Sequence, residues 1–181
     1  MATMLCFVTT DANIGKSCLK EAIENGVENT FNRITIDGDT STNDSVIVLA
    51  NGAAENKTIR RGTKECRDFR HALEFVMNKL AQAIVRDGER VTKFVTLEVK
   101  SARNASDAKK VAQAVANSFL VKSSWNGEDP NWGRIIHAVG YSGASIREEL
   151  VDIYYESKAA CKGGLQAKTN PEVLRNIVSK P

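Results

Sequence analysis

A run of polar residues from Asp37 to Ser45 is the densest group of side chains in this sequence that could do chemistry. Its nine residues carry three carboxylates, one amide and four hydroxyls, and apolar segments flank the run on both sides. Buried polar groups need partners, because an unpaired one costs roughly 1–3 kcal/mol. The run is therefore interpreted either as a solvated turn with capping residues or as the floor of a site for an amine, an amino acid or a cation.

A second candidate is Ile14-Gly15-Lys16-Ser17, which follows an apolar segment and opens a helical pattern. In that context the motif G-x-x-x-x-G-K-[ST] binds phosphate through backbone N–H groups. The segment Ile34–Asp37 has the form of the acidic strand that helps to hold Mg²⁺ in such proteins. However, Thr10 stands where the motif needs its first glycine, and its Cβ hinders close approach of a phosphate. Nucleotide binding stays as an alternative beside an ordinary helix start.

Hydrophobic periodicity predicts the elements that must position these residues. In the first half, the predictions are a strand over 4–10, a helix over 15–27, a strand over 33–37 and a long helix from Thr63 to Gly88. Residues 46–50 suit a buried strand, but they also suit a helix capped by Ser41 or Thr42 and closed by Gly52. The helix is the favoured interpretation.

The second half continues the alternation of strands and helices. The predictions are a strand over 91–100, a helix capped by Ser106, a helix from Asp129-Pro130 to Val139, a hairpin of 151–155 with 158–161, and a short helix from Asn170-Pro171. This order indicates the α/β class, and a length of 181 residues favours one domain over residues 1–181.

Composition excludes several classes of function. A net charge of +3 without a basic cluster argues against nucleic-acid binding. No apolar run approaches 18 residues and no signal peptide is evident, which predicts a cytoplasmic protein without a membrane span. The cysteines lie far apart without a C-x-x-C pair, which predicts no metal site and reduced, mostly buried thiols. They are Cys6, Cys18, Cys66 and Cys161.

The stretch Met1–Leu5 contains Thr3, which alone would be an ordinary strand residue. It gains meaning beside four other stretches, namely Phe31–Asp44, Val85–Glu89, Val91–Phe94 and Gly127–Arg134. In this combination the chain resembles the ornithine acetyltransferase (glutamate N-acetyltransferase) family of arginine biosynthesis. The resemblance runs from Met1 to at least Gly143 and continues more weakly to the end.

The resemblance implies a precursor that cuts itself before a threonine into α and β chains. The scissile bond corresponds to Ala2-Thr3, so the chain is similar to a β chain in which Thr3 is the nucleophile. The implied fold is a layered sandwich with helices packed outside paired β-sheets. The implied partner is the α chain of the same precursor, in a hetero-oligomer of αβ units.

The implied reaction is ping-pong acetyl transfer. Thr3 would take the acetyl group of N-acetylornithine as an ester and pass it to glutamate, with its freed amine as the base that a weak hydroxyl nucleophile needs. Glu89 matches the family's acidic substrate-binding residue and would pair with the substrate's ammonium group. The remaining site-lining candidates, without individual roles, are Asp39, Thr40, Asn43 and Asp44. No cofactor is implied, although acetyl-CoA is an alternative acetyl donor.

Three departures from the family pattern accompany the resemblance. Arg90 follows Glu89 where the family has glycine, the oxyanion donors belong to the α chain, and family β chains continue beyond Pro181 with a substrate-binding tail. The chain by itself is therefore expected to be inactive. Two further alternatives are a related self-processing aminopeptidase with an N-terminal nucleophile, and a purely structural subunit.

Overall fold

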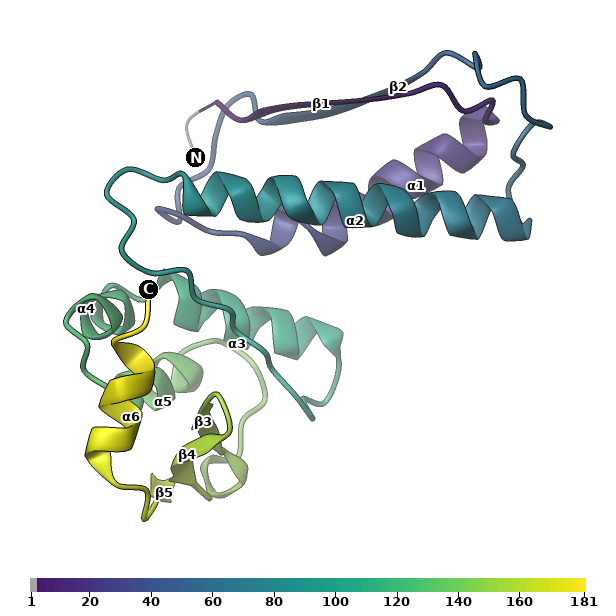
Figure 1. Cartoon of the computed structure of the whole chain (residues 1–181). Coiled ribbons are helices and arrows are strands. Elements are labelled where there is room, and N and C mark those ends of the chain that lie inside the picture. The colour runs from purple at the N-terminus through teal and green to yellow at the C-terminus, as the bar shows by residue number, and fades with distance from the viewer. Residues whose placement is uncertain (1–2) are drawn as a thin grey trace. The chain divides into compact units, whose positions relative to one another are not determined.

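The computed structural model describes residues 3–181, and the chain divides into two compact units, residues 1–89 and residues 90–181 (Figure 1). Each unit is described by itself. The expectation of a single domain over 1–181 stays a prediction. Across the described part of the chain, no helix is both long enough and apolar enough to cross a membrane.

Unit 1 is a β-α-β-α arrangement. Its elements are β1 (Leu5–Thr10), α1 (Lys16–Asn29), a short 3₁₀ helix η1 (Phe31–Arg33), β2 (Ser45–Ala50) and α2 (Lys64–Arg86). The two strands are parallel, with Leu5 opposite Ser45 and Thr10 opposite Ala50. Both helices lie on one face of this strand pair, as Figure 1 shows. The predicted strand over 4–10 and the helices over 15–27 and from Thr63 are confirmed.

The core of unit 1 forms where the inward side chains of the strands meet the apolar stripes of the helices. On α2, Leu73, Met77 and Ala81 step by four residues and are buried, which is the spacing of one helix face. The other buried members of this core are Met4, Cys6, Ala22, Phe31 and Val48. The hydroxyl of Thr63 accepts the N–H of Cys66 at 3.2 Å and caps the helix.

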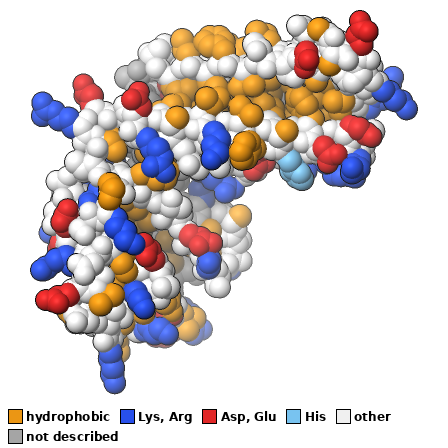
Figure 2. Space-filling view, in the orientation of Figure 1, with side chains coloured by type: hydrophobic (Ala, Val, Ile, Leu, Met, Phe, Trp, Pro, Cys, Tyr) orange, Lys and Arg blue, Asp and Glu red, His pale blue; other side chains and the backbone are white. Residues whose placement is uncertain are grey.

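The opposite face of the strand pair is apolar and exposed. Phe7 and Leu49 have 62% and 57% of their surface accessible, and their neighbours Leu5 and Ile47 point the same way. Apolar side chains are visible on both sides of the strand pair in Figure 2. Since parallel sheets are normally covered on both faces, unit 1 presents a sheet face that is built to be buried.

A disulfide joins Cys18 to Cys66, with the sulfur atoms 2.01 Å apart and the Cα atoms 6.2 Å apart. The expectation of four reduced thiols is therefore wrong for this pair, while Cys6 and Cys161 are free and buried. The two bonded residues are far apart in sequence, yet each lies in the first turn of its helix. Because β1 and β2 are parallel, α1 and α2 begin at the same end of unit 1, which brings these turns together.

Unit 2 packs four helices with a small antiparallel sheet. Its elements are α3 (Ala105–Asn117), α4 (Phe119–Asn126), α5 (Trp132–Gly140), a 3₁₀ turn η2 (Glu148–Leu150), β3 (Ile153–Tyr155), β4 (Lys158–Lys162), β5 (Leu165–Gln166) and α6 (Pro171–Val178). Its core contains Val111, Val115, Val121, Ala138 and Val139. The predicted hairpin and the last helix, capped by Asn170, are confirmed, whereas α4 was not predicted.

Two helices of unit 2 begin at an asparagine rather than at the predicted residue. The side chain of Asn104 caps α3 instead of Ser106, and Asn131 caps α5 instead of Asp129. In both cases the amide oxygen accepts the N–H three residues further on, at 2.8 Å from Asp107 and 3.2 Å from Arg134. The helices themselves lie where periodicity predicted them, so only the boundaries shift by a few residues.

Three predictions of secondary structure are wrong. Residues 33–37 are the end of η1 followed by irregular backbone and a bend, residues 45–50 are strand β2 instead of the favoured helix, and residues 91–100 form no strand. Alternating residues of the last segment, Leu97 and Val99, do pack against the core of unit 2. A strand also needs hydrogen bonds to a neighbour, and alternation within one segment carries no information about that neighbour.

Candidate active site

The register of the parallel strands brings Thr3 to the polar run. Leu5 lies opposite Ser45, so the residues just before β1 meet the residues just before β2 at the same edge of the sheet. The backbone continues this pairing beyond the strands, since the N–H of Ser45 donates to the carbonyl of Met4 at 2.8 Å. The polar run and Thr3 therefore lie together at this end of the strand pair.

The hydroxyl and the backbone nitrogen of Thr3 both have partners in the run. Its hydroxyl donates to Oδ1 of Asn43 at 3.1 Å, and its backbone N–H donates to Oγ of Ser41 at 3.3 Å. Ser41 and Asn43 are also bonded to each other, because the Ser41 hydroxyl donates to Oδ1 of Asn43 at 3.2 Å. The three residues form a small network on the surface of unit 1.

Asp44 holds the chain directly after Thr3. One carboxylate oxygen of Asp44 accepts the N–H of Met4 at 2.7 Å, a short bond to a charged acceptor. Thr3 itself has φ of 71°, in the left-handed region that β-branched residues rarely adopt. Such a conformation persists only where the surroundings hold it, and the bonds to Ser41, Asn43 and Asp44 provide this hold.

The other two candidates in the run are not joined to Thr3. Asp39 is exposed and its backbone N–H donates to Oδ1 of Asp37 at 2.9 Å, which is a local turn. That N–H bond is the main cause that lowers the pKa of Asp37, so its carboxylate stays charged under more acidic conditions than usual. Thr40 is exposed as well.

Glu89 lies in an exposed turn just beyond the end of α2. Because α2 runs back along the parallel strands, its last turn lies at the end of unit 1 where β1 begins, as Figure 1 shows. Glu89 is thus at the same end of the unit as Thr3, outside the hydrogen-bonded network. Ala2, the other residue of the expected cleavage site, lies outside the described residues.

Arg90, which stands where the family has glycine, adopts φ of 53°. Glycine enters this left-handed region freely, whereas a residue with Cβ pays roughly 1–2 kcal/mol. Arginine in place of glycine at position 90 therefore adds a side chain, while the backbone keeps the left-handed turn that a glycine would favour. The side chain adds a positive charge directly after Glu89.

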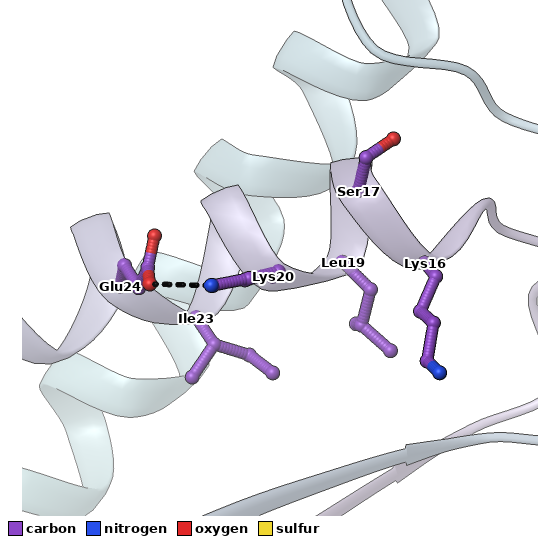
Figure 3. Close-up of a pocket in the computed structure, with 6 residues that line it drawn as sticks. All are labelled: Lys16, Ser17, Leu19, Lys20, Ile23 and Glu24. Carbon is purple, nitrogen blue, oxygen red and sulfur yellow. Dashed lines mark ion pairs between the residues drawn. The ribbon is translucent and has the colours of Figure 1, made fainter.

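The loop before Lys16 does not form a phosphate cradle. Backbone N–H groups of this loop already have acceptors inside the protein: Asn13 donates to Oδ1 of Asn56 at 2.8 Å, and Gly15 to the carbonyl of Ile59 at 2.9 Å. A hollow of about 690 Å³ borders α1 here, and Figure 3 shows Leu19 and Ile23 pointing into it, with Lys20 paired to Glu24 at 3.7 Å. Its apolar floor does not suit a nucleotide phosphate.

Among residues 3–181, no three His, Cys, Asp or Glu side chains gather closely enough to hold a metal ion. Ser41 is the site residue that sequence reasoning did not single out. The signal for it was its place two residues before Asn43, which lies as far from Ser45 as Thr3 lies from the paired residue Leu5. That signal appears only once residues 45–50 are recognised as a strand parallel to β1.

The site and the fold define a class: an α/β protein with a threonine presented at the sheet edge before its first strand. Comparison with known proteins gives the family. The ArgJ family model matches residues 1–181, and the chain belongs to this family. A solved structure, the arginine biosynthesis bifunctional protein ArgJ of Bacillus halodurans, is similar to this chain with a TM-score of 0.94 and 42% sequence identity. The matched region includes 99% of this chain and 84% of the solved chain. The α/β fold class and the family fold are confirmed.

Curated relatives carry two names. The arginine biosynthesis bifunctional protein ArgJ of Desulfotalea psychrophila is 49% identical over 180 residues, which are 99% of this chain and 46% of that protein. The glutamate N-acetyltransferase of Methanocaldococcus jannaschii is 50% identical over 153 residues, which are 84% of this chain and 37% of that protein. The chain thus spans less than half the length of these relatives.

Proposed function

We propose that this chain is the nucleophile-bearing part of a glutamate N-acetyltransferase of arginine biosynthesis. Thr3, freed by cleavage of the Ala2-Thr3 bond, takes an acetyl group from N-acetylornithine as an ester and passes it to glutamate. Glu89 pairs with the ammonium group of the donor. The enzyme works in the cytoplasm without a cofactor, and acetyl-CoA is an alternative acetyl donor.

The observation that carries this proposal is the arrangement around Thr3. Its hydroxyl and its nitrogen are each held by a side chain of the polar run, at 3.1 and 3.3 Å. A threonine hydroxyl is a weak nucleophile and needs an adjacent base, which its own amine supplies after cleavage. Because the chain belongs to the ArgJ family, we take N-acetylornithine as the acetyl donor and glutamate as the acetyl acceptor.

A second group of observations supports a partner chain. The matched part is 99% of this chain and 84% of the solved Bacillus halodurans chain, but only 46% of the Desulfotalea psychrophila protein. The solved chain is thus much shorter than a whole relative, as expected for a protein divided into two chains. The exposed apolar face of β1 and β2 is suited to contact with a partner chain, because a layer packed on it would bury Phe7 and Leu49. We infer an assembly of αβ units in which the α chain covers this face.

Mass spectrometry of the full-length protein tests the proposal. Cleavage should leave Thr3 as a new N-terminus, and incubation with N-acetylornithine should add one acetyl group to that residue. Thr3→Ala should abolish both cleavage and transfer, since each needs the hydroxyl. Glu89→Gln, which keeps the size of the side chain, should raise KM for N-acetylornithine and leave cleavage intact. Transferase activity that survives in Thr3→Ala would falsify the assignment.

A further inference from the structure

Two side chains of the polar run contact both groups of Thr3 that the proposed reaction uses. Oδ1 of Asn43 lies 3.1 Å from the nucleophilic oxygen, and Oγ of Ser41 lies 3.3 Å from the nitrogen that becomes the base. These contacts join residues about forty positions apart in the sequence. They form because the parallel register places the start of β1 beside the start of β2.

Hydrogen-bonding chemistry sets the direction of each contact. An amide oxygen only accepts, so the Thr3 hydroxyl must donate its proton to Asn43. The Ser41 hydroxyl also donates to this oxygen, at 3.2 Å. Ser41 has no second proton, so its oxygen accepts from nitrogen: from Thr3 and from the backbone N–H of Asn43, each at 3.3 Å. The network therefore holds the oxygen and the nitrogen of Thr3 in fixed directions.

We propose that Ser41 and Asn43 are positioning residues for Thr3, an inference that rests on the proposed function of this site. Asn43 holds the Thr3 hydroxyl in one rotamer, and Ser41 holds the nitrogen by one of its N–H bonds. Once the Ala2-Thr3 bond is cut, this leaves the lone pair of the amine free for the hydroxyl proton. Asn43 is too weak a base to take that proton itself.

The step that these residues prepare balances as follows. The amine of Thr3 takes the proton of Oγ1 while Oγ1 forms a bond to the acetyl carbonyl carbon of the donor. The bond between that carbon and the donor's nitrogen then breaks, and the amine returns the proton to the leaving nitrogen. Ser41 and Asn43 exchange no atom with the substrate, so their removal should affect the rate of this step rather than donor binding.

The experiment measures acetyl transfer by four variants in the full-length protein. Asn43→Ala and Ser41→Ala should each lower kcat by about 10- to 100-fold and leave KM for N-acetylornithine within about twofold, because misplacement of a reacting group has effects of this size. Asn43→Asp, which keeps an acceptor oxygen, should recover most of the loss. Thr42→Ala is the matched control, since Thr42 is exposed between the two residues, and it should keep the wild-type rate.

The pH profile gives a readout that a purely structural role would not move. Ser41 accepts a hydrogen bond that favours the charged amine, so Ser41→Ala should shift the acidic limb of kcat to lower pH. Variants that fail to cleave are produced as two separate chains with Thr3 directly after the initiator methionine. Hydrolytic removal of that methionine, checked by mass, then leaves Thr3 with a free amine. Their thermal unfolding should match that of Thr42→Ala.

The outcomes separate the two proposals. An active Thr3→Ala overturns the proposed function as a whole. An inactive Thr3→Ala combined with wild-type kcat in Asn43→Ala and Ser41→Ala overturns only the positioning roles. A rise in KM with unchanged kcat also overturns them, because it would place Ser41 or Asn43 in donor binding.

Discussion

Unit 1 and unit 2 differ in how their strands are covered. In unit 1 two parallel strands have helices on one face only, and the other face exposes Phe7 and Leu49. In unit 2 the strands are antiparallel and joined by short turns, and exposed residues such as Phe119 and Leu165 come from different elements. An antiparallel sheet tolerates one solvated face, whereas a parallel one is usually covered on both. Unit 1 thus leaves uncovered a face of the kind that parallel sheets usually bury, whereas unit 2 has the type of sheet that tolerates exposure.

The largest effect is expected when charges are placed on the open sheet face of unit 1. For the isolated chain we expect self-association that increases with concentration, and the double variant Phe7→Glu, Leu49→Glu should remove it by placing carboxylates on the apolar face. Sedimentation velocity measures the change. Leu165→Glu in unit 2 is the control and should leave the association as it is. A wild-type chain that stays monomeric at high concentration would contradict the idea that this face is built for burial.

The disulfide lies within unit 1 and should therefore stabilise that unit alone. A cross-link over 48 residues contributes about 2–4 kcal/mol to stability, so reduction should lower the free energy of unfolding of unit 1 by about that much. Both tryptophans, Trp125 and Trp132, lie in unit 2, so their fluorescence serves as the internal control and should change little. The helical circular dichroism signal follows both units.

Thiol counting checks the starting state for that experiment. Under denaturing conditions without a reductant, alkylation should label only Cys6 and Cys161, the two free cysteines. In the folded protein both should react slowly, because burial raises the pKa of each thiol and keeps it protonated. Four labels without a reductant would show that the Cys18–Cys66 bond is absent from the protein tested.

In unit 2 a half-buried tyrosine makes stability depend on alkaline pH. Burial, followed by the charge of Asp129, raises the pKa of Tyr155 from 10.0 to about 12. In the unfolded chain this phenol ionises first, so the stability that it contributes is present below about pH 10 and is lost as pH rises to about 12. Unfolding of unit 2, followed by tryptophan fluorescence in denaturant at about pH 9 and about pH 11, should show this loss. Tyr155→Phe should weaken the dependence, and the control Tyr154→Phe should not.

The smallest effect is expected where the two units meet in the sequence. Arg90 has φ of 53°, so Arg90→Gly should relieve roughly 1 kcal/mol of backbone strain, less the entropy that glycine adds to the unfolded chain. The net change in the unfolding free energy should be small and stabilising. Arg90→Ala is the matched control, because it removes the charge but keeps Cβ and should bring no gain. A destabilised Arg90→Gly would mean that the side chain makes a contact of its own.

Elements whose signals are local could be predicted from the amino-acid sequence. The long helix α2, the hairpin of β3 and β4, and the cap at Asn170 all follow from neighbouring residues, and all are present. The motifs around Thr3 and Glu89 likewise determined the family, which the ArgJ match confirms. These features depend on periodicity, turn residues and residue identity, which a single sequence displays directly.

Features that depend on pairing between distant segments could not be predicted from the sequence and became known from the three-dimensional structure. Residues 45–50 form a strand because they pair with β1 through backbone hydrogen bonds. Residues 91–100 lie outside any sheet, because an alternating pattern does not by itself provide a neighbouring strand for those bonds. The same register selected Ser41 and Asn43 as the partners of Thr3, and left Asp39 in a local turn. It also placed Cys18 beside Cys66, since helices that follow parallel strands start at the same end. The register is set by packing across the whole unit, and no local pattern in the sequence contains it.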